Sequence, residues 1–107
     1  MTMTNQYANQ IGYSDVRPFE IISVSKSGKQ ITIREMNAEK DPNWKPEFHV
    51  GGFSAHCSNQ SSQKWIITSD EDAKPMKAHL RKDGYFHSLY GRHLVEDQPR
   101  RFYDYNF

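Results

Sequence analysis

The sequence lacks a second cysteine, a long apolar run and a charge of either sign in excess, and each lack excludes a class of protein. Cys57 is the only cysteine in 107 residues, which rules out an intrachain disulfide and is typical of a reducing compartment. No apolar run approaches the ~20 residues of a membrane-spanning helix, and residues 1–10 lack the layout of a signal peptide. We therefore expect a cytoplasmic protein with no membrane partner.

The charge and the hydropathy exclude two further classes. The formal net charge is +1 and the sequence pI is about 7.9, so no field of the whole protein attracts DNA or acidic membranes, and a nucleic-acid role needs a local patch. Hydrophobic residues make up 36% and the mean hydropathy is −0.91, yet aromatic residues make up 13%. Disordered chains lack such aromatics, so we expect a folded core of a few large side chains and short β-branched runs.

The pattern along the chain predicts one β-rich domain. A length of 107 residues is typical of a single domain, and neither an internal repeat nor a convincing amphipathic helix is present. The expected fold class is mainly β, a single small partly open barrel or sandwich of five or six short antiparallel strands. Residues 1–10 are polar and are expected to be a flexible N-terminus, residues 11–107 form the domain, and residues 46–63 have room for a helical turn.

Residues 19–35 predict the first β-hairpin. Two β-branched runs flank Ser27 and Gly28, and Gly28 suits a turn position with positive φ. The expected opposed pairs are Val24 with Ile31 and Ile22 with Ile33. Because side chains alternate along a strand, these four apolar residues share one face.

Residues 76–88 predict a second hairpin around a three-residue loop, in which Gly84 takes a left-handed conformation. The expected opposed pairs are Arg81 with Tyr85, Leu80 with Phe86, and His79 with His87. This register turns Leu80 and Phe86 toward the core.

The remaining segments predict two more strands and several loops. Residues 64–69 form a compact strand, residues 48–53 form a short strand interrupted by two glycines, and residues 37–46 form a loop. Trp44 in that loop is either a lid over the core or an exposed stacking platform. Residues 100–107 are expected to pack as a final strand or a tail. The expected core consists of Ile22, Val24, Ile31, Ile33, Trp65, Ile67, Leu80 and Phe86.

No metal or nucleophilic centre is predicted. The five histidines and Cys57 show neither C-x-x-C nor H-E-x-x-H spacing, although His79 and His87 as cross-strand neighbours are the pair best placed for a metal. A cysteine nucleophile needs a base within hydrogen-bond reach, and the side chain of the adjacent His56 diverges, so Cys57 is expected to be a small buried hydrophobe. We expect no catalytic residue, no cofactor and no structural metal.

A site for an anionic, aromatic ligand is the third possibility. Such sites combine Arg or Lys for phosphate with aromatic planes for a base. The candidate ligand-binding residues are Arg81, Tyr85, Arg92, Arg100, Arg101, Tyr103, Asn59 and Gln60. The alternative is that these arginines merely cover aromatic rings at the surface of a β-domain. No Walker, G-x-G-x-x-G or RNP motif is present.

Five motifs resemble those of a family of short proteins common in tailed bacteriophage genomes. They are Tyr13-Ser14-Asp15 with Pro18, the run from Gly28 to Arg34, the run from His56 to Gln60 with Gln63-Lys64-Trp65, the run from Arg81 to Gly84, and the run from Phe102 to Phe107. The resemblance extends over nearly the whole chain from Gly12. It implies the cytoplasm of an infected host cell, and it implies no activity.

In that setting the expected function is non-enzymatic binding. A small phage protein of this kind is expected to antagonise host defence, either by sequestering a nucleotide-like anionic signal or by blocking a host protein. The alternatives are a nucleic-acid-binding accessory protein and a structural or virion-associated component. A sequestering protein should be a closed homo-oligomer with a buried basic and aromatic pocket, whereas a strand binder should show an open groove and a steep dependence on salt.

Overall fold

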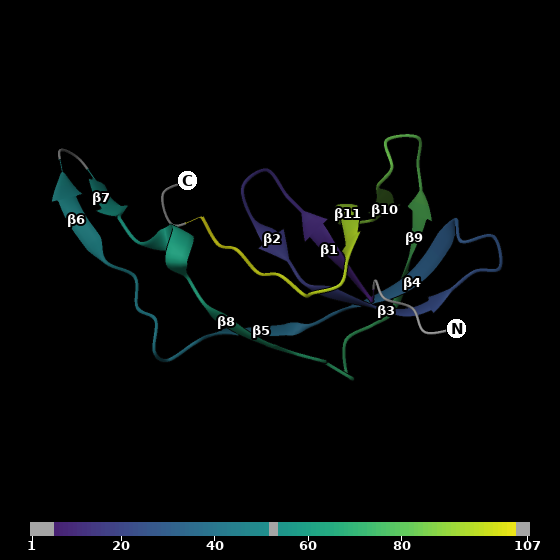
Figure 1. Ribbon diagram of the computed structural model, residues 1–107, viewed down its shortest axis with the longest axis horizontal. Helices are drawn as coiled ribbons and strands as arrows, with labels where there is room; N and C mark the ends of the chain where they lie inside the picture. Colours follow the sequence, from purple (N-terminus) through teal and green to yellow (C-terminus); the bar gives the residue numbers. More distant parts are fainter. Residues whose placement is uncertain (1–5, 52–53, 105–107) are drawn as a thin grey trace.

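Six antiparallel strands close into a barrel in the computed structural model, which describes residues 6–51 and 54–104 (Figure 1). In ring order the strands are β1 (Tyr7–Ile11), β3 (Phe19–Val24), β4 (Gln30–Glu35), β9 (Met76–Leu80), β10 (Phe86–Ser88) and β11 (Gly91–Glu96). The pairing of β11 with β1 completes the ring, and β2 (Val16–Arg17) adds an extra strand beside β1. The mainly β class is confirmed, and the barrel is closed.

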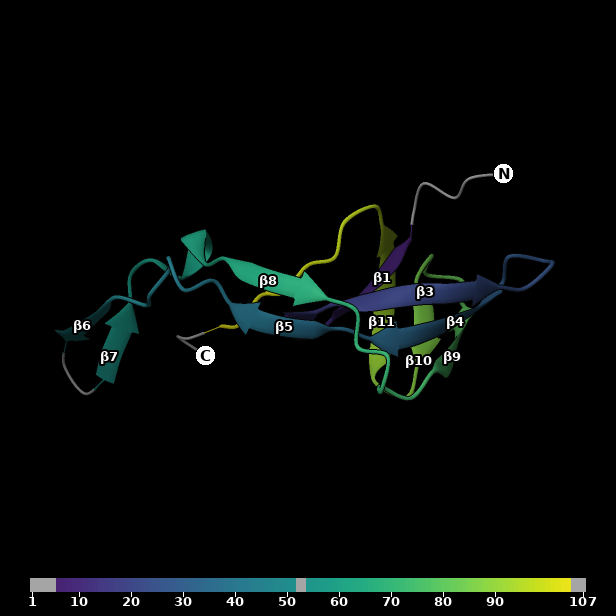
Figure 2. The ribbon, with the colours of Figure 1, turned by 90° about the horizontal axis from the view of Figure 1, so that it is seen from below.

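The described residues between β4 and β9, 36–51 and 54–75, form an arm that leaves the barrel on one side (Figures 1 and 2). In it β5 (Asn37–Lys40) pairs with β8 (Trp65–Thr68), and β6 (Phe48–Gly51) pairs with β7 (Ser54–Cys57) at the end of the arm. The molecule is accordingly elongated, with extents of 54 × 29 × 23 Å.

The arm differs from the sequence prediction in its first residues and agrees with it at the helical turn. The loop expected over residues 37–46 is wrong in its first part, because Asn37–Lys40 pairs with Trp65–Thr68 and forms β5. The helical turn expected within residues 46–63 is the 3-10 turn η1 (Gln60–Ser62). No helix in the described part of the chain is long and apolar enough to cross a membrane.

The barrel interior is filled by few side chains. The buried cluster contains Ala8, Phe19, Ile31, Ile33, Ala78 and Phe86, with Ile21, Met76 and Val95 packed against it. Phe19 meets the ring of His93 edge-on, with centroids 4.9 Å apart and an interplanar angle of 87°, a favourable aromatic arrangement. The predicted burial of Ile31, Ile33 and Phe86 is therefore confirmed.

A β-bulge changes the register of the first hairpin. Val24 opposes Ile31 as predicted, but an extra residue between Ile21 and Ser23 places Ile21 opposite Ile33. The bulge turns Ile22 outward, because a bulged strand carries one residue more than its partner. Ile22 is 46% exposed, so its predicted place in the core is wrong.

Four other predicted core residues lie outside the barrel core. Each of them lies at the margin of the barrel or on the arm. Val24 and Leu80, at the outer ends of β3 and β9, are 43% and 41% exposed. Trp65 and Ile67 are half-buried on β8 of the arm and not in the barrel core. The register of the second hairpin is nevertheless confirmed, with Leu80 opposite Phe86, His79 opposite His87, and Gly84 at φ 85°.

Residues 7–10 belong to β1, so the flexible N-terminus expected over residues 1–10 is wrong for these four residues. Asn9 is fully buried there. Its Nδ2 donates to Glu96 Oε1 at 3.0 Å and to the Gln98 carbonyl at 2.9 Å, and its Oδ1 accepts from the Arg100 backbone N–H at 2.9 Å. A buried amide needs such partners, and they join β1 to the segment after β11. Residues 1–5 lie outside the described residues.

The segment 100–104 runs from the barrel to the arm (Figure 1). Phe102 forms an isolated bridge with Val16, so residues 100–104 form a packed tail and not a strand, which were the two alternatives expected. Gln63 Nε2 donates to the Tyr103 carbonyl and Gln63 Oε1 accepts from the Tyr103 N–H, both at 2.9 Å. The Arg101 guanidinium lies 5.2 Å from the Trp65 ring centroid. This segment therefore fastens β8 of the arm to β2 of the barrel, and Tyr105–Phe107 lie outside the described residues.

Candidate functional site

Strands β9 and β11 turn cations toward solvent, and β10 between them turns a histidine outward. Along β9, the exposed side chains of Lys77 and His79 flank the buried Ala78, because successive side chains of a strand face opposite sides. The register sets His79 beside His87 of β10, and His87 beside Arg92 of β11. We call this surface the basic face and define it as Lys77, His79, Arg81, Tyr85, His87 and Arg92.

The hairpin turn at the edge of the basic face is held by Asp83. Its Oδ1 accepts the Tyr85 backbone N–H at 3.0 Å, and its Oδ2 lies 2.8 Å from His87 Nε2. The bond from Tyr85, and after it that from His87, lowers the pKa of Asp83 below its ordinary value of 3.8. The carboxylate is therefore ionised and positions His87. The Arg92 guanidinium lies 5.0 Å from the centroid of the Tyr85 ring, a cation–π contact.

Two open hollows lie on the basic face, and His79, Arg81 and His87 line both of them. The first, of about 630 Å³, reaches over the hairpin turn to Lys82. The second, of about 410 Å³, extends the other way to Leu89. Their shared lining makes the two hollows one continuous surface. It can offer several cations at once to an anion that lies across β9 and β10.

His93, on the inner side of β11, fixes the strand that carries Arg92. The His93 ring is fully buried. Its Nδ1 lies 2.8 Å from the Ala8 carbonyl and its Nε2 lies 2.7 Å from Ser88 Oγ. Burial lowers the pKa of His93 below its ordinary value of 6.5, so the ring is neutral near pH 7. Because a carbonyl only accepts, Nδ1 donates to Ala8 and Nε2 accepts from the Ser88 hydroxyl. The ring thus joins β11 to both β1 and β10.

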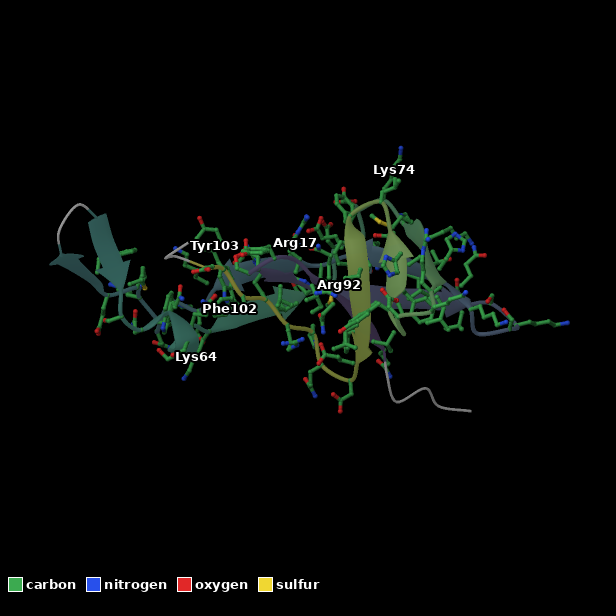
Figure 3. The ribbon with its side chains drawn as sticks, turned by 90° about the horizontal axis from the view of Figure 1, so that it is seen from above. Arg17, Lys64, Lys74, Arg92, Phe102 and Tyr103 are labelled. Carbon is green, nitrogen blue, oxygen red and sulfur yellow. The ribbon has the colours of Figure 1, made fainter. Side chains whose placement is uncertain are left out.

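Three of the eight predicted ligand residues, Arg81, Tyr85 and Arg92, come together on the basic face. Figure 3 shows that Arg92 lies on the barrel, whereas Phe102 and Tyr103 lie toward the arm.

Arg100, Arg101 and Tyr103 lie apart from the basic face and have structural contacts. Arg100 Nε is 2.8 Å from Glu96 Oε1. Arg101 Nη1 donates to the carbonyls of Val16 and Phe102, both at 2.9 Å, and its guanidinium lies over the rings of Trp65 and Tyr103. The contacts of Arg101 correspond to the alternative in which an arginine covers aromatic rings.

Asn59 and Gln60 lie on the arm. Asn59 Nδ2 donates to the Lys45 carbonyl and its Oδ1 accepts from the Glu47 N–H, both at 2.8 Å, while Gln60 begins η1. Next to them Cys57 is 1% exposed, which confirms a buried cysteine, and Trp44 is 8% exposed. Trp44 Nε1 donates to Ser62 Oγ at 3.2 Å. Trp44 is therefore buried within the arm and is not a lid over the barrel core.

The sequence analysis missed Lys77 as a ligand residue and considered His79 and His87 only as metal ligands. The signal was the i, i+2 spacing of Lys77, His79 and Arg81 in a strand, which places all three on one side. Within residues 6–51 and 54–104, no three His, Cys, Asp or Glu side chains gather as a metal site. The expected absence of a metal stays a prediction.

The fold and the basic face together define a class of protein, a small closed β-barrel with a projecting β-ribbon arm and cations on one outer side. Comparison with protein-family models, curated proteins and solved structures gives no match for this chain. Any statement about its function therefore depends on the residues of the basic face and on the chemistry that those side chains allow.

Proposed function

We propose that this chain is a non-enzymatic binding protein whose basic face holds a phosphate-bearing anion. The observation that carries the proposal is the common outward side of Lys77, Arg81 and Arg92, with two imidazoles between them. Ammonium and guanidinium groups are the usual protein donors to phosphate. The formal net charge of the whole chain is only +1, so anion binding depends on where the cations are grouped.

The resemblance to short bacteriophage proteins supports a role in the cytoplasm of an infected cell. Two classes of ligand there carry the required phosphates, a nucleotide-like signal of host defence and nucleic acid. Sequestering either one requires only tight binding. The side chains of the basic face suit that task, because they neutralise charge and donate hydrogen bonds.

A host protein is the second candidate ligand, and a different surface favours it. Tyr13 is 94% exposed and Tyr103 is 44% exposed, and with Arg17 they line an open hollow of about 380 Å³ beside β2. Tyrosine is enriched at protein interfaces because its ring is apolar and its hydroxyl is polar. Binding there would block a partner without use of the basic face.

Neutralising the basic face tests the proposal. The variant Lys77→Gln, Arg81→Gln, Arg92→Gln should bind fluorescein-labelled polyphosphate about 100-fold or more weaker than wild type, because each charge-assisted bond contributes ~1.5–3 kcal/mol. Fluorescence anisotropy measures the affinity. The probe carries no base, so it reports on phosphate alone.

The matched control is Lys40→Gln, Lys45→Gln, Lys64→Gln, which removes the same charge at exposed positions of the arm. Figure 3 shows Lys64 well apart from Arg92. The control should bind within about threefold of wild type, since distant exposed charges are screened. Equal losses in the two triple variants would refute the assignment of phosphate binding to the basic face.

A further inference from the structure

We infer that the anion is a single strand of nucleic acid, which lies across the basic face with its phosphates on the cations and unpaired bases on Tyr85 and Leu89, at the two ends of β10. The inference rests on the proposed function and names the ligand of the same surface. It depends on the dimensions of the cation array, on the apolar side chains within that array, and on the polar side chains along its border.

The cation array is larger than one nucleotide requires. Lys77 and His79 lie on β9 and Arg81 directly follows its end, so at an extended spacing of about 6.7 Å per two residues the row spans about 13 Å. Across the strands, the imidazoles of His79 and His87 lie between this row and the guanidinium of Arg92, over two spacings of about 4.8 Å each. A mononucleotide carries its phosphates at one end, whereas a nucleic-acid strand presents one phosphate per nucleotide. The array therefore matches a chain of phosphates.

Apolar side chains stand between the cations. His87 of β10 lies on the outward side, next to the buried Phe86, and Tyr85 and Leu89 lie directly before and after this short strand. Leu89 is 98% exposed and lines the second hollow beside Lys77. Cations that alternate with ring and apolar surfaces are typical of single-strand binding, in which bases stack on the protein. A duplex keeps its base faces covered, so these side chains favour unpaired bases.

Tyr85 is already paired with a cation. The Arg92 guanidinium lies 5.0 Å from its ring centroid, so the phenol and the guanidinium form one unit. Guanidinium planes, like aromatic rings, stack on nucleic-acid bases. The unit can thus contact a base and a neighbouring phosphate together, which a lone lysine cannot do.

Uncharged donors and acceptors border the array on β4. The register places Gln30 beside His79 and Thr32 beside Lys77. Amide and hydroxyl groups of this kind bind base edges and ribose hydroxyls without adding charge. The nearby acid Asp83 is engaged with His87 and the Tyr85 N–H.

Anisotropy titrations with a labelled oligonucleotide test the inference. Its length of about 12 nucleotides lies within the ~4–16 nucleotides that bind to one small barrel. The single strand, as DNA or RNA, should bind at least about tenfold tighter than the duplex of the same sequence. With three permanent cations on the face, the slope of log K against log[salt] should be about −2, since each neutralised phosphate contributes about −0.7. Arg92→Gln should make the slope less steep by about 0.7.

Two variants separate stacking from charge. Tyr85→Leu should weaken single-strand binding by roughly 5- to 150-fold, the loss typical of one stacked base, with the salt slope unchanged. Leu89→Glu places a negative charge on a fully exposed side chain that the core does not need, and it should weaken binding by about tenfold. The second variant keeps the test valid if the first one fails to fold.

The outcomes distinguish this inference from the proposed function. If AMP or pyrophosphate competes as well as the oligonucleotide at equal phosphate concentration, or if the duplex binds as tightly, the single-strand inference is wrong and the anion-binding function stands. If the oligonucleotide and polyphosphate both fail to bind, both proposals are wrong.

Discussion

Truncation of Ile33 to alanine should lower the free energy of unfolding by about 2–5 kcal/mol, because it leaves a cavity in a well-packed interior. Ile33 is fully buried on β4, where it opposes Ile21 and packs within the barrel cluster. A loss of this size is a large part of the ~5–15 kcal/mol that stabilises an ordinary domain. Urea denaturation followed by tryptophan fluorescence measures it.

The matched control is Ile22→Ala, which makes the same truncation in the same hairpin, but at a side chain that the bulge turns outward. Because Ile22 is 46% exposed, its truncation should cost about 0.5 kcal/mol or less. Similar losses for Ile22 and Ile33 would contradict the bulge, since they would mean that both side chains are buried to a similar degree.

Replacing Arg101 with glutamine should cost on the order of 1–3 kcal/mol, from two charge-assisted hydrogen bonds and the stacking on Trp65. The guanidinium donates to the carbonyls of Val16 and Phe102 and covers the Trp65 ring at 5.2 Å. Because segment 100–104 fastens the arm to the barrel, hydrogen exchange should also accelerate in β8. Denaturation and exchange measured on the same variant check both effects.

Arg100→Gln is the control for Arg101, since it removes the same charge one residue earlier. The Arg100 side chain is 47% exposed and pairs with Glu96 at the surface, and such pairs contribute about 0–1 kcal/mol. Its backbone bond to Asn9 is kept. If Arg100→Gln destabilises the protein as much as Arg101→Gln, the segment is not fastened by the Arg101 side chain.

Local patterns in the sequence were sufficient to predict the two hairpins and their turns. Alternation around Gly84 predicts the register of β9 and β10, and Gly28 lies at its turn with φ 75° as expected. Alternation could not reveal the bulge at Ile22, because Ile21 and Ile22 are equally apolar and tertiary packing decides which of them faces inward.

Local sequence patterns could not predict the contacts between distant parts of the chain. β1 is polar, and its burial depends on pairing with β11, about 85 residues away, through the Ala8 carbonyl and His93. The arm depends in the same way on the pairing of β5 with β8 and on Gln63 with Tyr103. Local propensity carries no information on which distant segment supplies these partners.

The candidate site was predictable in part for the same reason. The sequence predicts the second hairpin correctly, and β11 follows that hairpin directly. Arg81, Tyr85 and Arg92 therefore lie on one surface. Arg101 was predicted as a ligand residue from its residue type, but its partners Val16 and Trp65 come from distant parts of the chain. Composition shows that cations and rings are present, and only the fold shows which of them are engaged with each other.

Mapping the bound strand on the protein tests the central claim most directly. On addition of a single-stranded oligonucleotide to ¹⁵N-labelled protein, the largest amide chemical-shift changes should fall in β9, β10 and β11, with little change in β5 and β8. Large changes confined to the arm, or to the turn at residues 12–15 beside Tyr103, would contradict the assignment of ligand binding to the basic face.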